Sequence, residues 1–172
     1  MPIYALGDVE PTIHPDAFVH PDAVVIGDVV IGSLSSIWPG AVLRGDDGGI
    51  RIGERTSIQD NCVLHTTRLH PTTVGSDCVI GHLVHLEGCT IEDDVLVGNA
   101  SIVMHRVIVR SGSMVAANAV VLDDTEVPTG ALAVGVPATI KAGRAHPGRA
   151  RDGAQIYVRR AEHYRQHLRR IG

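Results

Sequence analysis

The segment GHLVHLEGC, residues 81–89, contains three side chains that could bind a metal ion. His82, His85 and Glu87 lie within six residues of one another, among glycines and aliphatic residues. Two histidines with one carboxylate form a recognised open site for zinc or iron. The same side chains could instead be polar residues on the outside of a strand. The direction in which each side chain points decides between these interpretations, and the repeat of the chain sets that direction.

Length and composition indicate one folded domain. The chain has 172 residues, of which 44% are hydrophobic and nineteen are glycine. No basic segment followed by an apolar stretch opens it, and no apolar run is long enough to span a bilayer, so we expect a cytoplasmic protein with no membrane partner. The three cysteines, Cys62, Cys78 and Cys89, have no CxxC spacing. This pattern argues against a disulfide framework and against a cysteine-only zinc site.

Charge is distributed unevenly between the body and the tail. Residues 1–137 hold six arginines and no lysine against seventeen acidic residues, a net charge of −11, whereas residues 138–172 carry +7. Because the body has the opposite sign, we expect the tail to pack on its own body or on a neighbouring one rather than to bind nucleic acid.

Aliphatic residues recur every six positions along most of the chain, and small or slim residues follow four positions after most of them. The aliphatic series is Ile13, Val19, Val25, Ile31, Ile37, Leu43, Ile52, Ile58, Leu64, Val74, Ile80, Leu86, Ile91, Val97, Val103, Val109, Val115, Val121 and Val127. The small series is Ala17, Ala23, Val29, Ser35, Ala41, Thr56, Cys62, Cys78, Val84, Val95, Ser101, Val107, Ser113 and Ala119.

A hexapeptide period of this kind predicts a parallel β-helix, because short repeats bury their apolar faces by stacking on copies of themselves. Three hexapeptides make one triangular coil, so residues 1–138 are expected to form about seven coils. Residues 139–172 are expected to be a basic tail with an amphipathic helix over 154–170, after a flexible lead-in from Gly148 to Gly153. The apolar face of that helix consists of Tyr157, Ala161, Tyr164 and Leu168.

Breaks in the period fall at one corner of the triangle. Extra residues follow Leu43 and Leu64, and the step after Leu86 is one residue short. The residues that come next, Arg44, His65 and Glu87, should therefore stack on successive coils. Neighbouring strands lie about 4.8 Å apart, close enough for two such side chains to share an ion.

His82 belongs to a different corner, above Asp60. A single chain does not easily bring it beside His65, but a second copy does if corners meet around a three-fold axis. The spacing therefore predicts an assembly of copies if both histidines bind one metal.

Three segments carry a family resemblance: LRGD (43–46), SIQDNCVLH (57–65) and GHLVHLEGC (81–89). Together with the C-terminal helix, they resemble the gamma-class carbonic anhydrase-like hexapeptide proteins. The resemblance implies a left-handed β-helix and a homotrimer with zinc or iron at each interface. His65 and His82 match two of the family's three metal-binding histidines, one of them supplied across the interface, and Glu87 stands where the family has the third.

The resemblance also implies an activity, the hydration of CO2 to bicarbonate by metal-bound hydroxide. Gln59 matches the glutamine that orients the bound water, and Ser57 stands where the best-studied enzymes have an asparagine. Tyr164 matches a helix tyrosine near the active site. The segment HTTRLHPTT (65–73) is too short to supply the family's proton-shuttling loop, and Glu87 adds negative charge to the metal, so we expect weak activity.

The remaining candidate site residues, Arg44, Asp46 and Asp60, can be interpreted as structural or supporting residues. Arg44 and Asp46 match the family's R-x-D motif and suit an ion pair that holds the trimer together. Asp60 is either a carboxylate that supports a ligand or a turn residue.

Alternatives remain open on sequence grounds. His85 is the rival third ligand, although its stack through Val42, Val63 and Ile102 is apolar. A hexapeptide acyltransferase would use coenzyme A and one histidine as general base. A metal-binding or assembly protein without catalysis is a third reading. His14, His20, His70, His105 and His146 have no partner spacing and are expected on the surface.

Overall fold

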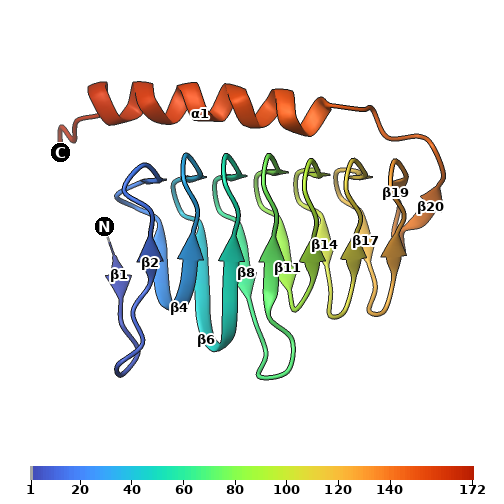
Figure 1. Cartoon of the computed structure of the whole chain (residues 1–172), viewed down its shortest axis with the longest axis horizontal. Helices are drawn as coiled ribbons and strands as arrows, with labels where there is room; N and C mark the ends of the chain where they lie inside the picture. Colours follow the sequence, from blue (N-terminus) through green and yellow to red (C-terminus); the bar gives the residue numbers. More distant parts are fainter. Residues whose placement is uncertain (1) are drawn as a thin grey trace.

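The two six-residue columns of the sequence both point into one continuous core. In the computed structural model, which describes residues 2–172, aliphatic residues such as Ile37, Leu64 and Leu86 are fully buried together with small residues such as Ala41 and Cys62. The chain winds into a parallel β-solenoid of about seven turns with a single helix laid along it (Figure 1). The fold class predicted from the hexapeptide period is therefore confirmed.

Each coil contributes a strand to each of three faces, and the long strands β4 and β6 pass from the third face of one coil to the first face of the next. The first face holds β2 (Thr12–Ile13), the ends of β4 (Val24–Ile31) and β6 (Val42–Ile52), β9 (Thr72–Val74), β12 (Thr90–Ile91), β15 (Ile108–Val109) and β18 (Glu126–Val127). The second face holds β3 (Phe18–Val19), β5 (Ser36–Ile37), β7 (Ser57–Ile58), β10 (Val79–Ile80), β13 (Leu96–Val97), β16 (Met114–Val115), β19 (Leu132–Val134) and β20 (Thr139–Lys141), the last antiparallel to β19. The third face holds β1 (Ile3–Tyr4), the starts of β4 and β6, β8 (Val63–His65), β11 (His85–Glu87), β14 (Ile102–Val103) and β17 (Val120–Val121).

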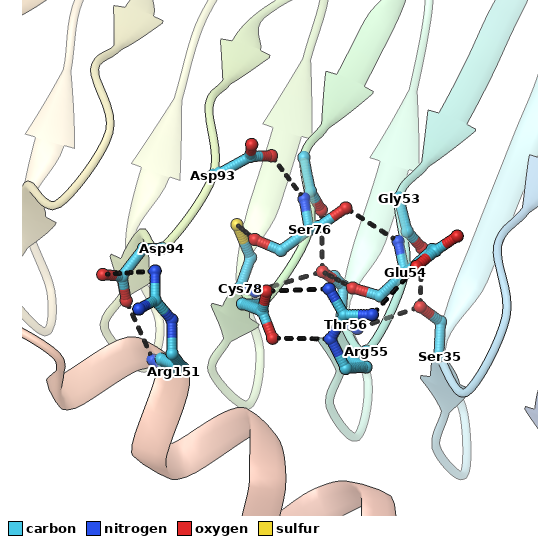
Figure 2. Close-up of polar contacts among 12 residues, drawn as sticks. Ser35, Gly53, Glu54, Arg55, Thr56, Ser76, Cys78, Asp93, Asp94 and Arg151 are labelled. Atoms are coloured by element: carbon cyan, nitrogen blue, oxygen red, sulfur yellow. Dashed lines mark hydrogen bonds and ion pairs between the residues drawn. The ribbon is translucent and has the colours of Figure 1, made fainter.

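Polar members of the small column hydrogen-bond to backbone carbonyls, and Ser35, Thr56 and Cys78 reach those of the next coil. Ser35 Oγ donates to the Gly53 carbonyl at 2.7 Å, and Thr56 Oγ1 donates to the Gly75 carbonyl at 2.7 Å (Figure 2). Cys78 Sγ lies 3.0 Å from the Glu92 carbonyl oxygen. Burial of these polar groups is tolerated because each has a partner, and the cysteines act as filler, as expected.

The helix α1 (Arg149–His167) starts earlier than the sequence predicted. Gly148 precedes it with a φ of 74°, a left-handed conformation that glycine adopts without strain. The expected lead-in from Gly148 to Gly153 was wrong, because residues from Arg149 onward are helical. Ala150 and Ala154 are buried, and Gly153 faces Val79 so closely that an added Cβ would lie 3.1 Å from Val79 Cγ2. Small residues therefore let the first turns of the helix approach β10.

The helix lies along the second face and runs back toward the N-terminal coils (Figure 1). Near its start the Arg151 backbone N–H donates to Asp94 Oδ1 at 3.0 Å, and the Arg151 guanidinium lies 3.5 Å from Asp94 Oδ2 (Figure 2). Near its end the Arg165 guanidinium donates to the carbonyls of Asp16 and Ala17. Arginines at both ends of the helix thus contact carboxylate or carbonyl oxygens on the body of the same chain.

Within residues 2–172, the structure contains no helix long and apolar enough to cross a bilayer.

Candidate metal centre

The corner that follows the third face brings together four of the predicted site residues. Arg44 on β6 pairs in register with His65 on β8, and His65 pairs with Glu87 on β11. This is the stack predicted from the breaks in the period. Asp46, two residues after Arg44, also reaches the corner, where Arg44 Nη1 donates a hydrogen bond to Asp46 Oδ2. The Arg44–Asp46 pair predicted from the sequence is therefore present.

The imidazole ring of His65 lies between two carboxylates. Its Nδ1 is 3.1 Å from Glu87 Oε1, and its Nε2 is 3.3 Å from Asp46 Oδ1. The geometry of the second contact is not that of a hydrogen bond, and both atoms are buried without a hydrogen-bond partner among the described residues. A buried polar group without a partner is unusual in a native structure and is explained by a bound water, an ion or a neighbouring chain.

Glu87 contacts two further histidines. Its Oε2 lies 2.9 Å from His85 Nε2, and its Oε1 lies 3.6 Å from His105 Nε2. His105 also approaches His70, with ring centroids 5.9 Å apart. The expectation that His70 and His105 are surface residues without partners was wrong. Sequence reasoning missed His105 because it lies two positions past Val103, in the turn, although that position belongs to the same corner as His65.

Both carboxylates of the corner are held in the ionised form. The hydrogen bond from His85, supported by one from His65, lowers the pKa of Glu87 although partial burial raises it. Burial also raises the pKa of Asp46, but the hydrogen bond and the charge of Arg44 outweigh it, so the net shift is downward. Carboxylates of lowered pKa are ready to bind a cation at neutral pH.

His82 lies at the corner after the second face. Its Nδ1 is 2.8 Å from Asp60 Oδ2, and its backbone N–H donates to Asn99 Oδ1 at 3.1 Å. The next residue, Leu83, has a φ of 64°, so the chain turns sharply there. Asp60 therefore contacts His82, the residue predicted to be a ligand.

The predicted residues Ser57, Gln59 and Tyr164 lie beneath or within the helix. Ser57 Oγ accepts a hydrogen bond from Trp38 Nε1 at 3.1 Å, and the Tyr164 ring stacks edge-on with Trp38 at 5.1 Å between centroids. Gln59 is 4% exposed, and its side chain lies close to Tyr157. Tyr157, seven positions before Tyr164, is thus the helix tyrosine that contacts the predicted water-orienting glutamine.

The donors at the third-face corner fit a zinc or iron ion in their chemistry. An imidazole nitrogen and a carboxylate oxygen, both buried and without hydrogen-bond partners, are donor atoms that either metal accepts. Over residues 2–172, however, a single chain does not gather three His, Cys, Asp or Glu side chains in an arrangement that could hold a metal. Any site that uses His65 and His82 together therefore requires a second copy.

Comparison with known proteins identifies the family. Residues 10–45 match the family described as bacterial transferase hexapeptide (six repeats). The chain is 43% identical over 137 residues to the mitochondrial gamma carbonic anhydrase 1 of Arabidopsis thaliana, covering 76% of this chain and 50% of that protein. It is 39% identical over 140 residues to the carnitine operon protein CaiE of Salmonella agona, covering 81% of this chain and 71% of that protein. The chain belongs to the gamma carbonic anhydrase-like hexapeptide-repeat proteins.

Solved structures agree with this assignment at the level of fold. The crystal structure of a hexapeptide transferase family protein from Anaplasma phagocytophilum matches this gamma carbonic anhydrase-like chain with a TM-score of 0.89 at 36% identity, covering 95% of this chain and 98% of that one. The chain spans about half the length of the plant gamma carbonic anhydrase that it matches. Relatives with carbonic anhydrase names and relatives with transferase names thus share this fold.

Proposed function

We propose that the chain is a metal-dependent carbonic anhydrase-like enzyme that hydrates CO2 to bicarbonate with weak activity. The metal, zinc or iron, lies between copies of a homotrimer. His65 of one copy and His82 of the next hold it, with a carboxylate of the His65 corner as third ligand. Two carboxylates flank the His65 ring, Glu87 at Nδ1 and Asp46 at Nε2, and Glu87 is the ligand predicted from the sequence.

The observation that carries this proposal is the His65 Nε2 atom, which is buried and lacks a hydrogen-bond partner among the described residues. Its ring is fixed by the contact between Nδ1 and Glu87. A histidine that is oriented by a carboxylate and keeps its other nitrogen free has the arrangement of a metal ligand. His82 has the same arrangement, with Nδ1 held by Asp60. Gamma carbonic anhydrase names among the relatives give further support.

Residues of the chain have separable roles in this proposal. A bound zinc or iron ion supplies a Lewis acid that makes water acidic near neutral pH. His65 and His82 fix the position of the ion, and Glu87 and Asp60 orient their rings. Gln59, which lies close to Tyr157, presents its amide near the His82 corner and orients the reacting water. Ser57 and Tyr164 support this corner indirectly, by packing on Trp38.

Assembly through the third face supports the requirement for a second copy. Val63 and Ile102, which flank His85 on neighbouring strands, are 40% and 37% exposed in the single chain. Exposed aliphatic side chains beside a ligand corner suit a contact between copies.

The test is metal content measured together with CO2 hydration on anaerobically purified protein. We expect one zinc or iron per chain, a trimer by light scattering, and CO2 hydration that chelation abolishes. His65→Ala and His82→Ala should both lose the metal and keep the β-helix, because the core columns are untouched. His163→Ala, an exposed histidine on α1, is the matched control and should keep both metal and rate. Full metal content in both ligand variants would refute the proposal.

Acyl transfer from coenzyme A is the second candidate, and the contact between His82 and Asp60 favours it. A carboxylate at Nδ1 leaves Nε2 basic, which is the state needed in a general base. The Anaplasma structure bears a transferase name. Acetyl-CoA consumption by metal-free protein, lost in His82→Ala but kept in His65→Ala, would favour this candidate over CO2 hydration, which needs both histidines and the metal.

A further inference from the structure

The two candidate histidine ligands are oriented in the same way, each by a carboxylate on a neighbouring coil. His82 Nδ1 lies 2.8 Å from Asp60 Oδ2, and His65 Nδ1 lies 3.1 Å from Glu87 Oε1. A carboxylate accepts a hydrogen bond, so in each ring the proton resides on Nδ1 and the lone pair on Nε2. The parallel indicates that Glu87 has the role of Asp60, which is to position a histidine.

Both oxygens of Glu87 are in contact with histidines. Its Oε1 is engaged by His65 Nδ1, and its Oε2 lies 2.9 Å from His85 Nε2. An ion bound by Glu87 would have to share an oxygen with one of these contacts, and the contact at Oε1 orients the His65 ring.

Asp46 presents the opposite situation. Its Oδ2 is held by Arg44, while its Oδ1 is buried, without a hydrogen-bond partner, and 3.3 Å from the lone pair of His65 Nε2. Two lone pairs that face each other at this distance repel unless a proton or a metal cation lies between them. Zinc bonds to nitrogen and oxygen at about 2.0–2.2 Å, which at a tetrahedral angle separates the two donor atoms by about 3.4 Å. The observed separation of 3.3 Å is compatible with two ligands of one metal.

We propose that Asp46 Oδ1, rather than Glu87, is the carboxylate ligand of the metal, and that Glu87 is a positioning residue for His65. The ion is then held by His65 Nε2 and Asp46 Oδ1 of one copy and His82 Nε2 of the next. This inference rests on the proposed interfacial metal site and assigns its donor atoms. Arg44 keeps Asp46 charged and aligned, so the Arg44–Asp46 pair serves the metal as well as the corner.

The test compares Asp46→Asn and Glu87→Gln with Asp47→Asn as the matched control. Asp47 is the exposed neighbour of Asp46 on the same strand. The readouts are metal affinity, by competition with a chelator, and the visible spectrum of the cobalt-substituted trimer. We expect Asp46→Asn to weaken binding at least 100-fold and to change the cobalt bands. Glu87→Gln should weaken it about 10–100-fold, the range for residues that orient ligands, and leave the band positions unchanged. Asp47→Asn should match the wild type.

A cysteine at position 46 gives a direct readout if Asp46→Asn assembles poorly. Asp46→Cys should add a near-ultraviolet thiolate-to-cobalt charge-transfer band that the wild type lacks, because its own cysteines are buried in the core. The inference fails, while the proposed function stands, if Asp46→Cys lacks this band and Asp46→Asn keeps its metal, or if Glu87→Gln shifts the cobalt bands. Wild-type protein that binds no metal would overturn both.

Discussion

The second and third faces of the β-helix have the same six-residue repeat of inward-pointing residues. Their outward-pointing residues differ in how far they are exposed to solvent. On the second face Ser57 and Trp38 are 1% and 3% exposed, because the aromatic side of α1 covers them. On the third face Val63 and Ile102 are 40% and 37% exposed, beside the His65 corner. The inward-pointing residues therefore stabilise each coil, and the outward-pointing residues determine what the coil packs against. One face is closed by the chain's own helix, and the other has the composition of a contact between copies.

Disruption of the third face should have the largest effect. Val63→Glu places a charge in the proposed interface, where an unpaired buried charge costs roughly 3–5 kcal/mol at each contact. We expect the trimer to dissociate to one third of its mass and to lose its metal, as measured by light scattering and metal analysis, while the circular dichroism of the β-helix is kept.

Ile156→Glu is the matched control for that change. Ile156 is 47% exposed on α1, so the same substitution there should leave mass and metal unchanged. A Val63→Glu protein that stays trimeric would mean that the third face is not the interface, and the contrast between the two faces would lose its functional meaning.

Removal of the Trp38 ring, which packs between the second face and α1, should have the next largest effect. Trp38→Ala deletes a ring that packs on Phe18, Tyr157 and Tyr164 and donates to Ser36 and Ser57. We expect the free energy of unfolding, from urea titration, to fall by about 3–5 kcal/mol. Val63→Ala should cost less than about 1 kcal/mol in the dissociated chain, because its side chain is already partly exposed. Equal losses in the two variants would contradict the comparison.

A smaller effect should come from Asp77, at the corner between the first and second faces. Arg55 donates to both of its oxygens, at 2.8 and 3.0 Å, and this contact lowers the pKa of Asp77 below 3.8. A carboxyl group with a lowered pKa stabilises the fold above its unfolded pKa, and the contribution is lost as the pH falls through the folded value. Asp77→Asn, which suits the φ of 57°, should therefore cost about 1–2 kcal/mol at pH 7.

The pH dependence identifies the cause of that loss. The difference between wild type and Asp77→Asn should shrink below pH 3.8, measured by urea unfolding with chelator in every sample so that loss of metal in acid does not contribute. Asp8→Asn, at an exposed turn, should show no such difference. A difference that is constant with pH would mean that packing of the side chain, not its charge, is responsible.

The sequence predicted whatever depends on the six-residue period. The inward columns, the three faces and the stack of Arg44, His65 and Glu87 all follow from counting residues, because strands in a parallel β-helix pair in register. The apolar side of the helix was predicted in part. Tyr157, Ala161 and Tyr164 pack on the second face, whereas Leu168 lies beyond the last helical residue and is 46% exposed.

Features outside the period could not be predicted in the same way. The positions of His85 and His105 around Glu87 depend on how side chains rotate above a corner, which residue spacing does not set. The helix begins at Arg149 because Gly153 and the buried alanines let it approach β10, a packing effect that helix propensity does not reveal. Contact of Tyr157 with Gln59 depends on the axial position of the docked helix. The six-residue pattern thus predicts the coils, whereas the arrangement of the site side chains depends on tertiary packing.

The reversed course of α1 has a consequence for biosynthesis. Arg165 donates a hydrogen bond to the carbonyl of Asp16, 149 positions earlier, so the cover of the first coils is translated after all of the coils. Coils can stack as they emerge, because each contacts only its neighbours. Phe18 and Trp38 nevertheless stay open to water until the helix has been translated, and exposed apolar surface of this kind promotes aggregation of nascent chains. Translation of the helix therefore ends the exposure of Phe18 and Trp38 to water.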